Sequence, residues 1–429
     1  MKQPIFNSLG SNYSSEVVKL ASKNVRDPFR DDDHVLSRLE EELERRFDGV
    51  ALLVYKGRDA IELALKAVMH FGASKKHIAP AVLTQGLACH AIEEGILRAG
   101  YKPVYVDLEK QTLGPSVRTL EEGLRDAKAH GLEVQAVFIQ HTLGYANPVP
   151  EIRRFCDRYG LVLIEDLAQS FGAQDAAGNV LGSQADIVIC SFGRDKVIDA
   201  VSGGAVIVKH KSFRVPHREV LGWKSGVAPT AFPPKSIARK EMIYPRLTEW
   251  IRSTHAIGLG KLLFQLAKSL RLLTSPIASP TQQTTALPAS YARLVLWQLE
   301  HLEKQLAHRR QIARIYGEAL ADVPGAQCLA RVDELDRDIH LRVPLLFDDP
   351  TAMSAVINAC QAERIYISDR WYRSVVDSGS LNYATRYQQK SCPVAEYTAS
   401  RVLNLPTHRY ITVQDAQRIV RVIRQVLER

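Results

Sequence analysis

An acid, a hydroxyl and an amine follow two neighbouring apolar runs in this chain of 429 residues. Asp166 ends the apolar run 161–166, and Ser191 lies near the end of the next run, 185–192. Lys196 follows five residues after Ser191. Ligands of a parallel sheet bind outside the carboxyl ends of its strands. The three side chains could therefore converge on one ligand.

This combination suits pyridoxal phosphate. The Lys196 amine could bond to the cofactor's aldehyde, and the Asp166 carboxylate could keep the ring nitrogen protonated so that the ring accepts electrons. The Ser191 hydroxyl could hold the phosphate, and Gln169, three residues after Asp166, could reach the same ligand. Each residue alone has a simpler role, as a turn lysine, a helix cap or a local backbone partner. Their order on successive strand ends favours a cofactor site.

A second phosphate-binding element is expected where the run 49–55 passes into a helix. Free backbone N–H groups of Gly57, Arg58 and Asp59 could bind a phosphate, and Arg58 could add charge-assisted hydrogen bonds. The alternative is an ordinary helix start, in which Asp59 only offsets the helix dipole.

The elements that would position these residues alternate along the first half of the chain. Buried strands are predicted for five runs rich in branched apolar residues, 49–55, 102–108, 134–140, 161–166 and 185–192. Helices are predicted between most of them, at 58–71, 87–100 and 150–160. This alternation predicts an α/β fold with a mostly parallel central sheet flanked by helices.

The chain is expected to have three parts. Residues 1–210 would form a large cofactor-binding domain, and 284–429 a long helix followed by a smaller C-terminal α+β domain. Residues 211–283 interrupt the alternation with seven prolines. This segment contains twelve Lys and Arg against three Asp and Glu, so it carries all of the chain's net charge of +9.

The basic segment 211–283 has several interpretations. It could be a surface insertion or an arm that contacts a second subunit. Its amphipathic stretch 258–273 could instead lie on a membrane surface, or its cations could meet an acidic nucleotide or lipid-linked substrate. It lacks a recognisable recognition motif for nucleic acid, so no nucleic-acid partner is expected.

Composition places the chain among ordinary soluble proteins, with 46% hydrophobic and 24% charged residues. No apolar run is long enough to cross a bilayer, and the first residues lack the apolar core of a secretory signal. The six cysteines form no CxxC pair, so neither a metal site nor a disulfide framework is expected. These features favour a cytoplasmic protein.

The sequence resembles the DegT/DnrJ/EryC1/StrS family of sugar aminotransferases, which are pyridoxal phosphate enzymes of fold type I. The resemblance covers most of the chain apart from 211–283. It is carried by "GLVLIEDLAQSFGA" at 160–173 and "ADIVICSFGRDKVIDAVSGGAVIV" at 185–208. Three further segments fit the family pattern in order, at 136–152, 297–313 and 392–408.

The resemblance implies a role for each candidate residue. Lys196 would bond to the cofactor and then move the proton between cofactor and substrate. Asp166 would pair with the ring nitrogen, Gln169 would contact the ring hydroxyl side and Ser191 the phosphate. The phosphate cup of the family would fall on 57–59.

Three positions depart from the family pattern. The cup usually reads Gly-Thr or Gly-Ser, whereas here Arg58 follows Gly57. Thr84 or Gln85 falls where the family commonly has an aromatic residue that stacks on the cofactor, and Gln85 is the expected contact there. The family's phosphate-binding Asn from the neighbouring subunit would fall within 281–290, which contains no Asn.

The function implied is transfer of an amino group, by family habit from L-glutamate, to a nucleotide-linked keto-sugar in surface polysaccharide, glycan or antibiotic sugar biosynthesis. The family also implies a homodimer. One alternative is a sugar dehydratase, although that branch typically has histidine at the position of Lys196. Another is a non-catalytic binding or regulatory protein, which the altered cup favours and the intact Lys196 and Asp166 disfavour.

Overall fold

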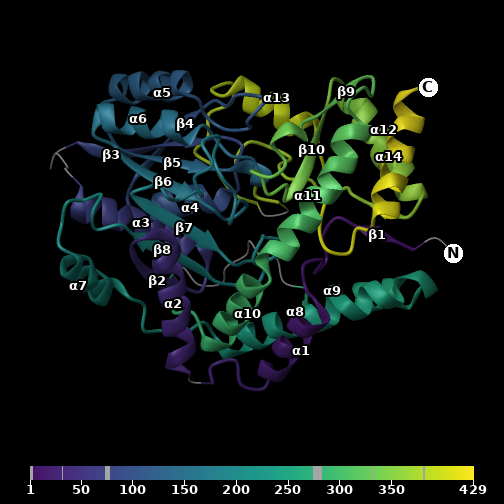
Figure 1. Cartoon of the computed structure of the whole chain (residues 1–429), viewed down its shortest axis with the longest axis horizontal. Helices are drawn as coiled ribbons and strands as arrows, with labels where there is room; N and C mark the ends of the chain where they lie inside the picture. Colours follow the sequence, from purple (N-terminus) through teal and green to yellow (C-terminus); the bar gives the residue numbers. More distant parts are fainter. Residues whose placement is uncertain (1–2, 31, 73–77, 274–282, 331, 380–381) are drawn as a thin grey trace.

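A computed structural model describes the whole chain except residues 1–2, 31, 73–77, 274–282, 331 and 380–381. Its centre is a seven-stranded sheet with the order β2-β8-β7-β6-β5-β3-β4 (Figure 1). The strands are β2 (Val50–Val54), β3 (Ala79–Gln85), β4 (Lys102–Val106), β5 (Leu132–Gln140), β6 (Val162–Asp166), β7 (Ile187–Ser191) and β8 (Gly204–Val208).

The sheet is parallel from β4 through β7, and only β8 runs antiparallel to its neighbours β7 and β2. The predicted α/β class with a mostly parallel sheet is therefore confirmed. Strand β3 was not among the predicted strands. Its first residues are exposed or half-buried and include Pro80, so the apolar run that marks a buried strand is shortened to Ala81–Leu83.

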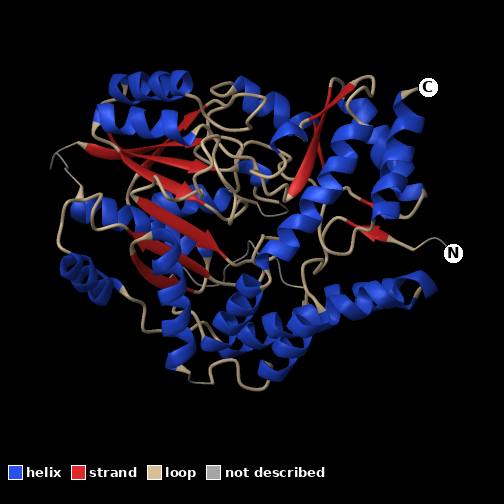
Figure 2. Ribbon diagram, viewed as in Figure 1, coloured by secondary structure: helices blue, strands red, loops and turns tan. Residues whose placement is uncertain are grey.

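Both faces of the sheet are covered, as Figure 2 shows. Alternate residues of β2 contribute to two different apolar clusters, Ala51 and Leu53 to one and Val50, Leu52 and Val54 to the other. One face packs against α2 (Asp33–Phe47), α5 (Val117–Ala129), α6 (Val149–Tyr159) and α10 (Ala289–Glu300). The other packs against α3 (Gly57–Phe71), α4 (His90–Arg98) and α7 (His217–Val227).

The C-terminal part has its own apolar cluster around a three-stranded sheet of order β12-β10-β9. Its elements are α11 (Leu302–Ala319), β9 (Ala326–Cys328), β10 (Arg342–Phe347), α12 (Pro350–Ala362), β11 (Ile365–Tyr366), α13 (Pro393–Arg401), β12 (Val402–Pro406) and α14 (Val413–Leu427). The N-terminal strand β1 (Ile5–Phe6) pairs in parallel with β11, so the two ends of the chain lie on the same side of the molecule (Figure 1). Two short helical turns, η1 (Thr142–Gly144) and η3 (Val332–Glu334), lie in the loops.

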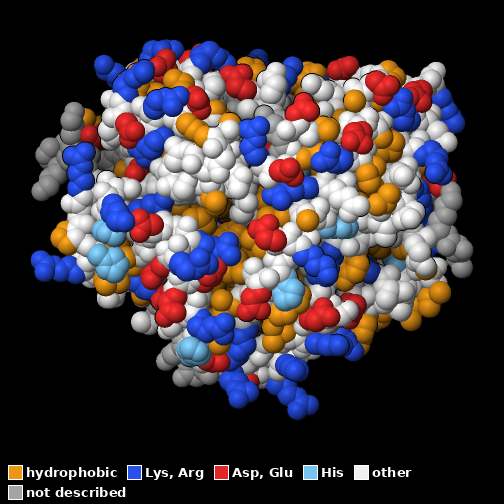
Figure 3. Space-filling view, in the orientation of Figure 1, with side chains coloured by type: hydrophobic (Ala, Val, Ile, Leu, Met, Phe, Trp, Pro, Cys, Tyr) orange, Lys and Arg blue, Asp and Glu red, His pale blue; other side chains and the backbone are white. Residues whose placement is uncertain are grey.

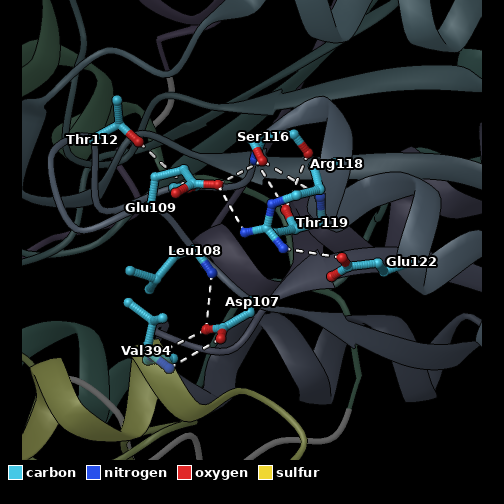
Figure 4. Close-up of polar contacts among 11 residues, drawn as sticks. Asp107, Leu108, Glu109, Thr112, Ser116, Arg118, Thr119, Glu122 and Val394 are labelled. Atoms are coloured by element: carbon cyan, nitrogen blue, oxygen red, sulfur yellow. Dashed lines mark hydrogen bonds and ion pairs between the residues drawn. The ribbon is translucent and has the colours of Figure 1, made fainter.

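Asp107, just after β4, joins the large sheet to the C-terminal part (Figure 4). Its carboxylate accepts hydrogen bonds from the backbone N–H groups of Val394 and Ala395, at 3.0 and 2.9 Å. These amides open helix α13, where a negative charge also offsets the positive end of the helix dipole. The contact fixes α13 against the carboxyl edge of β4.

The segment that follows β8 is helical. It contains α7, α8 (Lys235–Thr254), η2 (His255–Ile257) and α9 (Leu259–Ser269), and α1 (Ser15–Asn24) packs on α8. Because α7 packs on β2 and α8 on α1, this segment is continuous with the body of the molecule. The boundaries expected at 210 and 283 stay predictions. Within the described residues, no helix combines the length and the apolar character needed to cross a bilayer.

Candidate active site

A cavity of about 460 Å³ opens at the carboxyl edge of the central sheet. Six of the eight residues predicted from the sequence line it, namely Lys196, Asp166, Gln169, Ser191, Gly57 and Arg58. The antiparallel strand β8 begins at this same edge, and its first residue, Gly204, pairs with Ser191 at the end of β7. The loop that carries Lys196 therefore connects two adjacent strand ends.

The Lys196 loop is held from several sides. The Lys196 carbonyl accepts a hydrogen bond of 2.9 Å from the Asn12 side chain. The buried Asp199 carboxylate accepts hydrogen bonds from the backbone N–H groups of Asp195 and Val201, at 2.8 and 3.0 Å. The amine itself lies 4.9 Å from the centre of the Trp371 ring. Burial lowers the pKa of Lys196, which favours the neutral amine that a nucleophile or base requires.

Asp166 is the last residue of β6 and pairs in register with Gln140, the last residue of β5. One carboxylate oxygen accepts a 2.9 Å hydrogen bond from the Ala168 N–H, and the other lies 3.4 Å from the Gln140 amide nitrogen. Burial raises the pKa of Asp166, and the Ala168 N–H and the nearby Lys196 amine partly oppose that rise. Its carboxylate would therefore be stabilised by a cation in the cavity.

Gln169 belongs to a buried network that includes an aromatic residue from the C-terminal part. Its side-chain oxygen accepts a 2.6 Å hydrogen bond from the Leu143 N–H, and its amide donates to the hydroxyl of Tyr372. Tyr372 in turn donates to the Gln140 oxygen at 3.1 Å. Trp371 and Tyr372 both line the cavity, although neither was predicted as a site residue. They lie about 200 residues after Asp166, so no local spacing could indicate their place.

The Gly57 backbone approaches Ser191 too closely for any side chain at this position. A Cβ atom on Gly57 would lie 2.8 Å from the Ser191 hydroxyl oxygen. A glycine is therefore required where helix α3 begins, next to a hydroxyl at the end of β7. The two together form a narrow polar corner of the cavity at a helix N-terminus, which is the usual place for a bound phosphate.

Two predicted residues are placed differently from the expectation. Asp59 does not line the cavity, because its carboxylate bonds to Arg98 at 2.9 Å and its N–H bonds to the Lys56 carbonyl at 3.0 Å. Its assignment to the phosphate cup stays a prediction, which these bonds do not favour. Arg58 does line the cavity, and its guanidinium also contacts Glu94 on α4.

Gln85 does not line the cavity either. It is fully buried, its amide donates a 2.7 Å hydrogen bond to the Thr142 hydroxyl, and its oxygen accepts from the Gln140 N–H at 3.2 Å. These bonds turn the side chain toward the neighbouring strand β5. The expected cofactor contact at Gln85 stays a prediction, which this orientation of the side chain does not favour.

Helix α8 supplies a wall of the cavity that the sequence did not indicate. Its Glu241 carboxylate bonds to the amine of Lys56 at 2.8 Å, and Lys56 also donates to the Ser202 hydroxyl at 2.6 Å. One turn later, the Tyr244 ring lies 3.7 Å from the Arg194 guanidinium carbon. Lys56, Ser202, Tyr244 and Arg194 all line the cavity.

Glu241 carries a negative charge next to Lys56 of this wall. Burial alone would raise the pKa of Glu241, but Lys56 and Arg194 outweigh burial and the net pKa is lowered. No signal in the sequence marked Glu241 or Tyr244. Their helix contains Pro245, and proline is a breaker in helix prediction.

The residues of the cavity fit pyridoxal phosphate. They include a buried amine, a buried carboxylate on a neighbouring strand end, and a narrow hydroxyl-lined corner at a helix N-terminus. Aromatic rings from Trp371, Tyr372 and Tyr244 supply apolar surface for a planar ring. Within the described residues, no group of three or more His, Cys, Asp or Glu side chains is arranged to hold a metal ion.

Comparisons with known proteins find sugar aminotransferases. A UDP-N-acetyl-3-dehydro-alpha-D-glucosamine 3-aminotransferase of Acidithiobacillus ferrooxidans is 25% identical over 385 residues, which cover 86% of this chain and 82% of that protein. A dTDP-4-amino-4,6-dideoxy-D-glucose transaminase of Shigella dysenteriae is 23% identical over 348 residues, which cover 80% of this chain and 79% of that protein.

Solved structures share the fold. The putative sugar aminotransferase Spr1654 of Streptococcus pneumoniae, described in its PMP form, superimposes with a TM-score of 0.73 at 16% identity, over 99% of this chain and 98% of that one. AtS13 of Actinomadura melliaura gives a TM-score of 0.70 at 20% identity, over 99% of both chains.

The sequence pattern of one enzyme family matches residues 33–215 and 284–424, which together form the greater part of the chain. The unmatched part between them, 216–283, corresponds to the basic segment and includes helix α8. The chain therefore belongs to the DegT/DnrJ/EryC1/StrS aminotransferase family, whose members depend on pyridoxal phosphate.

Proposed function

We propose that this aminotransferase moves an amino group, with L-glutamate as the expected donor, onto a keto-sugar carried by a nucleotide. The expected context is surface polysaccharide, glycan or antibiotic sugar biosynthesis. The observation that carries the proposal is that Lys196 and Asp166 line the same buried cavity at two neighbouring strand ends. Two relatives are named for UDP- and dTDP-linked amino sugars, which supports the substrate class.

Lys196 would act as the base and acid of the reaction. Its lowered pKa makes the neutral amine available for taking a proton from the substrate carbon and returning it. The held loop keeps this amine in one place through both halves of the transfer. When bound, pyridoxal phosphate supplies the aldehyde that carries the amino group and the ring that takes up electrons.

Asp166 would face the ring nitrogen and favour its protonated form. The Ala168 N–H and the Gln140 amide fix the orientation of the carboxylate, and burial excludes water that would weaken its charge. Gln169 would approach the hydroxyl side of the ring. Its bond to Tyr372 links that position to the C-terminal part of the chain.

The Ser191 corner would hold the phosphate group. Gly57 allows the backbone at the start of α3 to approach, and the Ser191 hydroxyl and the Arg58 guanidinium can donate hydrogen bonds. We add Lys56 and Arg194 to this set, because both line the same wall and both are cations. They offer a charge-based substitute for the asparagine that the family takes from a neighbouring subunit.

Two further cations would serve the sugar nucleotide. Arg370 and Arg373 line the cavity on the side of the C-terminal part. Guanidinium groups bind phosphate oxygens in a two-pronged geometry, which suits a nucleotide diphosphate. The homodimer implied by the family and the cytoplasmic location favoured by the sequence composition remain part of this proposal.

The test is a spectroscopic titration of the purified full-length protein with pyridoxal phosphate. We expect a visible absorption band that L-glutamate bleaches and that a panel of nucleotide-linked keto-sugars restores. A band that glutamate leaves unchanged would contradict amino transfer from this donor. Absence of any band would favour the non-catalytic alternative. Loss of a sugar hydroxyl without amine incorporation would favour the dehydratase, which Lys196 disfavours.

A further inference from the structure

Helix α9 exposes a row of leucines to solvent. Leu259, Leu262, Leu266 and Leu270 are 45%, 62%, 51% and 57% exposed, and they follow one another at intervals of three and four residues. At 100° per residue this spacing places them on one stripe of the helix. Such a stripe normally faces a protein core. Here it faces outward, and Figure 3 shows hydrophobic side chains at the lower right edge, where α9 lies in Figure 1.

A different side of α9 is already anchored. A Cβ atom on Gly260 would lie 2.2 Å from the Ile251 carbonyl oxygen, so the backbones of α9 and α8 touch at this glycine. Ala267, two turns later on the same side, is buried. The orientation of α9 is therefore fixed by close packing on α8, and the leucine stripe is held away from the protein.

The surroundings of the stripe are strongly basic. Lys261 and Lys268 are exposed on the side of α9 that faces away from the stripe, and Arg271 is exposed just after the helix ends. The sequence contains no Asp or Glu from residue 250 to residue 299. Ile257 and Trp250, 72% and 50% exposed, extend the apolar surface toward the end of α8. We call residues 250–271 the α9 surface.

We propose that the α9 surface binds the plane of an anionic lipid membrane. The stripe would enter the boundary between headgroups and acyl chains, and Lys261, Lys268 and Arg271 would lie among the negative headgroups. An exposed Trp at the border of the apolar surface suits the same boundary. The helix would lie on the membrane without crossing it, so the active-site cavity would work at the membrane surface.

The chemistry of the α9 surface favours lipid over a second protein chain. Protein interfaces are depleted in Lys, and their energetic centres are rich in Trp, Tyr and Arg with few Leu. The exposed apolar residues of the α9 surface are mainly leucines, and its exposed cations are Lys261, Lys268 and Arg271. Anionic headgroups, by contrast, attract clustered Lys and Arg whatever their detailed geometry.

The test uses full-length, cofactor-loaded protein and sedimentation with vesicles. One set contains phosphatidylcholine alone and the other adds phosphatidylglycerol. We expect retention on the anionic vesicles that falls as salt rises, and little retention on the neutral ones. No retention on anionic vesicles would overturn the proposal.

Variants locate the contact. Leu262→Asp and Leu266→Asp should each weaken vesicle binding at least about tenfold, because each removes a leucine from the acyl boundary. The double variant Lys261→Glu, Lys268→Glu should weaken vesicle binding about fivefold or more for each cation removed. Leu221→Asp, at an exposed leucine on α7 of the same basic segment, is the matched control and should bind as the parent does. Equal binding by the Leu262 variant and the parent would refute the assignment to α9.

Two control measurements test whether the variants stay folded and whether a second copy covers the α9 surface. All variants should keep their absorption band with pyridoxal phosphate, because the substituted residues are exposed and lie outside the cavity. The oligomeric state should be measured by light scattering for the parent and for Leu262→Asp. Dissociation of a parent oligomer by Leu262→Asp would show that a second copy covers the α9 surface, and the membrane proposal would fall.

Discussion

Helices α8 and α9 are consecutive in the same basic segment, yet they meet different surroundings. Helix α8 places Tyr244 in the wall of the active-site cavity and pairs Glu241 with the lining residue Lys56, whereas α9 turns its leucines to solvent. Both helices lie outside the part of the chain that matches the family pattern. The difference teaches that a segment absent from a family pattern can have one half built into the site and another half available to a partner.

The two helices differ because their inward side chains have different partners. On α8, the Glu241 carboxylate meets the Lys56 cation and the Tyr244 ring meets the Arg194 cation, while the buried Thr248 hydroxyl donates to backbone carbonyls. Burial of charged groups is tolerated only under such conditions. On α9, the inward positions are Gly260 and Ala267, which pack closely but bury little apolar area. Most of the apolar area of α9 therefore stays outside the fold.

The largest expected effect is on the rate of amino transfer, which should depend on a lysine of the cavity and not on a lysine of α9. Lys196→Ala should lower the rate of amino transfer by about 10²–10⁴-fold or more, because the proton-transfer group is lost. Lys261→Ala, the same change on α9, should leave the rate unchanged. Single-turnover measurements with L-glutamate compare the two. A Lys196→Ala rate equal to the parent rate would remove Lys196 from the chemistry.

The second test concerns the ion pair of α8. Glu241→Ala should lower the free energy of unfolding by about 3–5 kcal/mol, because Lys56 would keep a buried charge without its carboxylate. It should also weaken the binding of pyridoxal phosphate, since Lys56 would lose its fixed position. Glu219→Ala, at an exposed acid on α7, should change the free energy by less than about 0.5 kcal/mol. Urea unfolding measures the free energy of both variants. Equal losses for Glu241→Ala and Glu219→Ala would mean that the ion pair of α8 stabilises the fold no more than an exposed acid does.

The third test compares two apolar side chains of the basic segment. Met242→Ala should cost about 2–5 kcal/mol of unfolding free energy, because Met242 is fully buried on α8. Leu262→Ala should cost far less, because Leu262 is 62% exposed. Thermal unfolding in the absence of lipid gives both values. A large loss at Leu262 would indicate that the stripe packs against protein in solution.

The smallest expected effect is the pH dependence of stability that Asp199 contributes. Burial and the neighbouring Asp195 raise the pKa of Asp199 to about 7, well above its unfolded value. The native state then holds a proton that the unfolded state releases, so this group makes stability fall as pH rises from about 4 to 7. Asp199→Asn should remove a decline on the order of 1–3 kcal/mol across that interval. An unchanged slope would show that Asp199 is ionised throughout, held by its bonds to Tyr13 and two N–H groups.

The sequence was sufficient for the features that depend on strand ends. Asp166, Ser191 and Lys196 follow long apolar runs, so their meeting at one edge could be predicted from the parallel sheet alone. Gly57 was found for a related reason, because a glycine at a strand-to-helix junction is typical of a backbone that approaches a ligand or a neighbouring strand closely.

The features that the sequence did not indicate depend on distant contacts. Trp371 and Tyr372 reach the cavity from an irregular segment of the C-terminal part, and α8 contains a proline that hides its helical pattern. The direction of Gln85 depends on a hydrogen bond to Thr142, which follows the neighbouring strand β5, and no local pattern indicates it. The direction of Asp59 depends on Arg98, which lies on another helix, and is equally hidden from the sequence.

The central claim is that the amine of Lys196 is the group that bonds to pyridoxal phosphate, and a second cavity lysine, Lys56, makes the claim easy to contradict. Borohydride reduction of the loaded protein would fix the cofactor on its lysine, and peptide mass mapping would locate it. We predict the label on Lys196, and none on the Lys196→Ala protein. A label on Lys56 in the parent protein would contradict the claim.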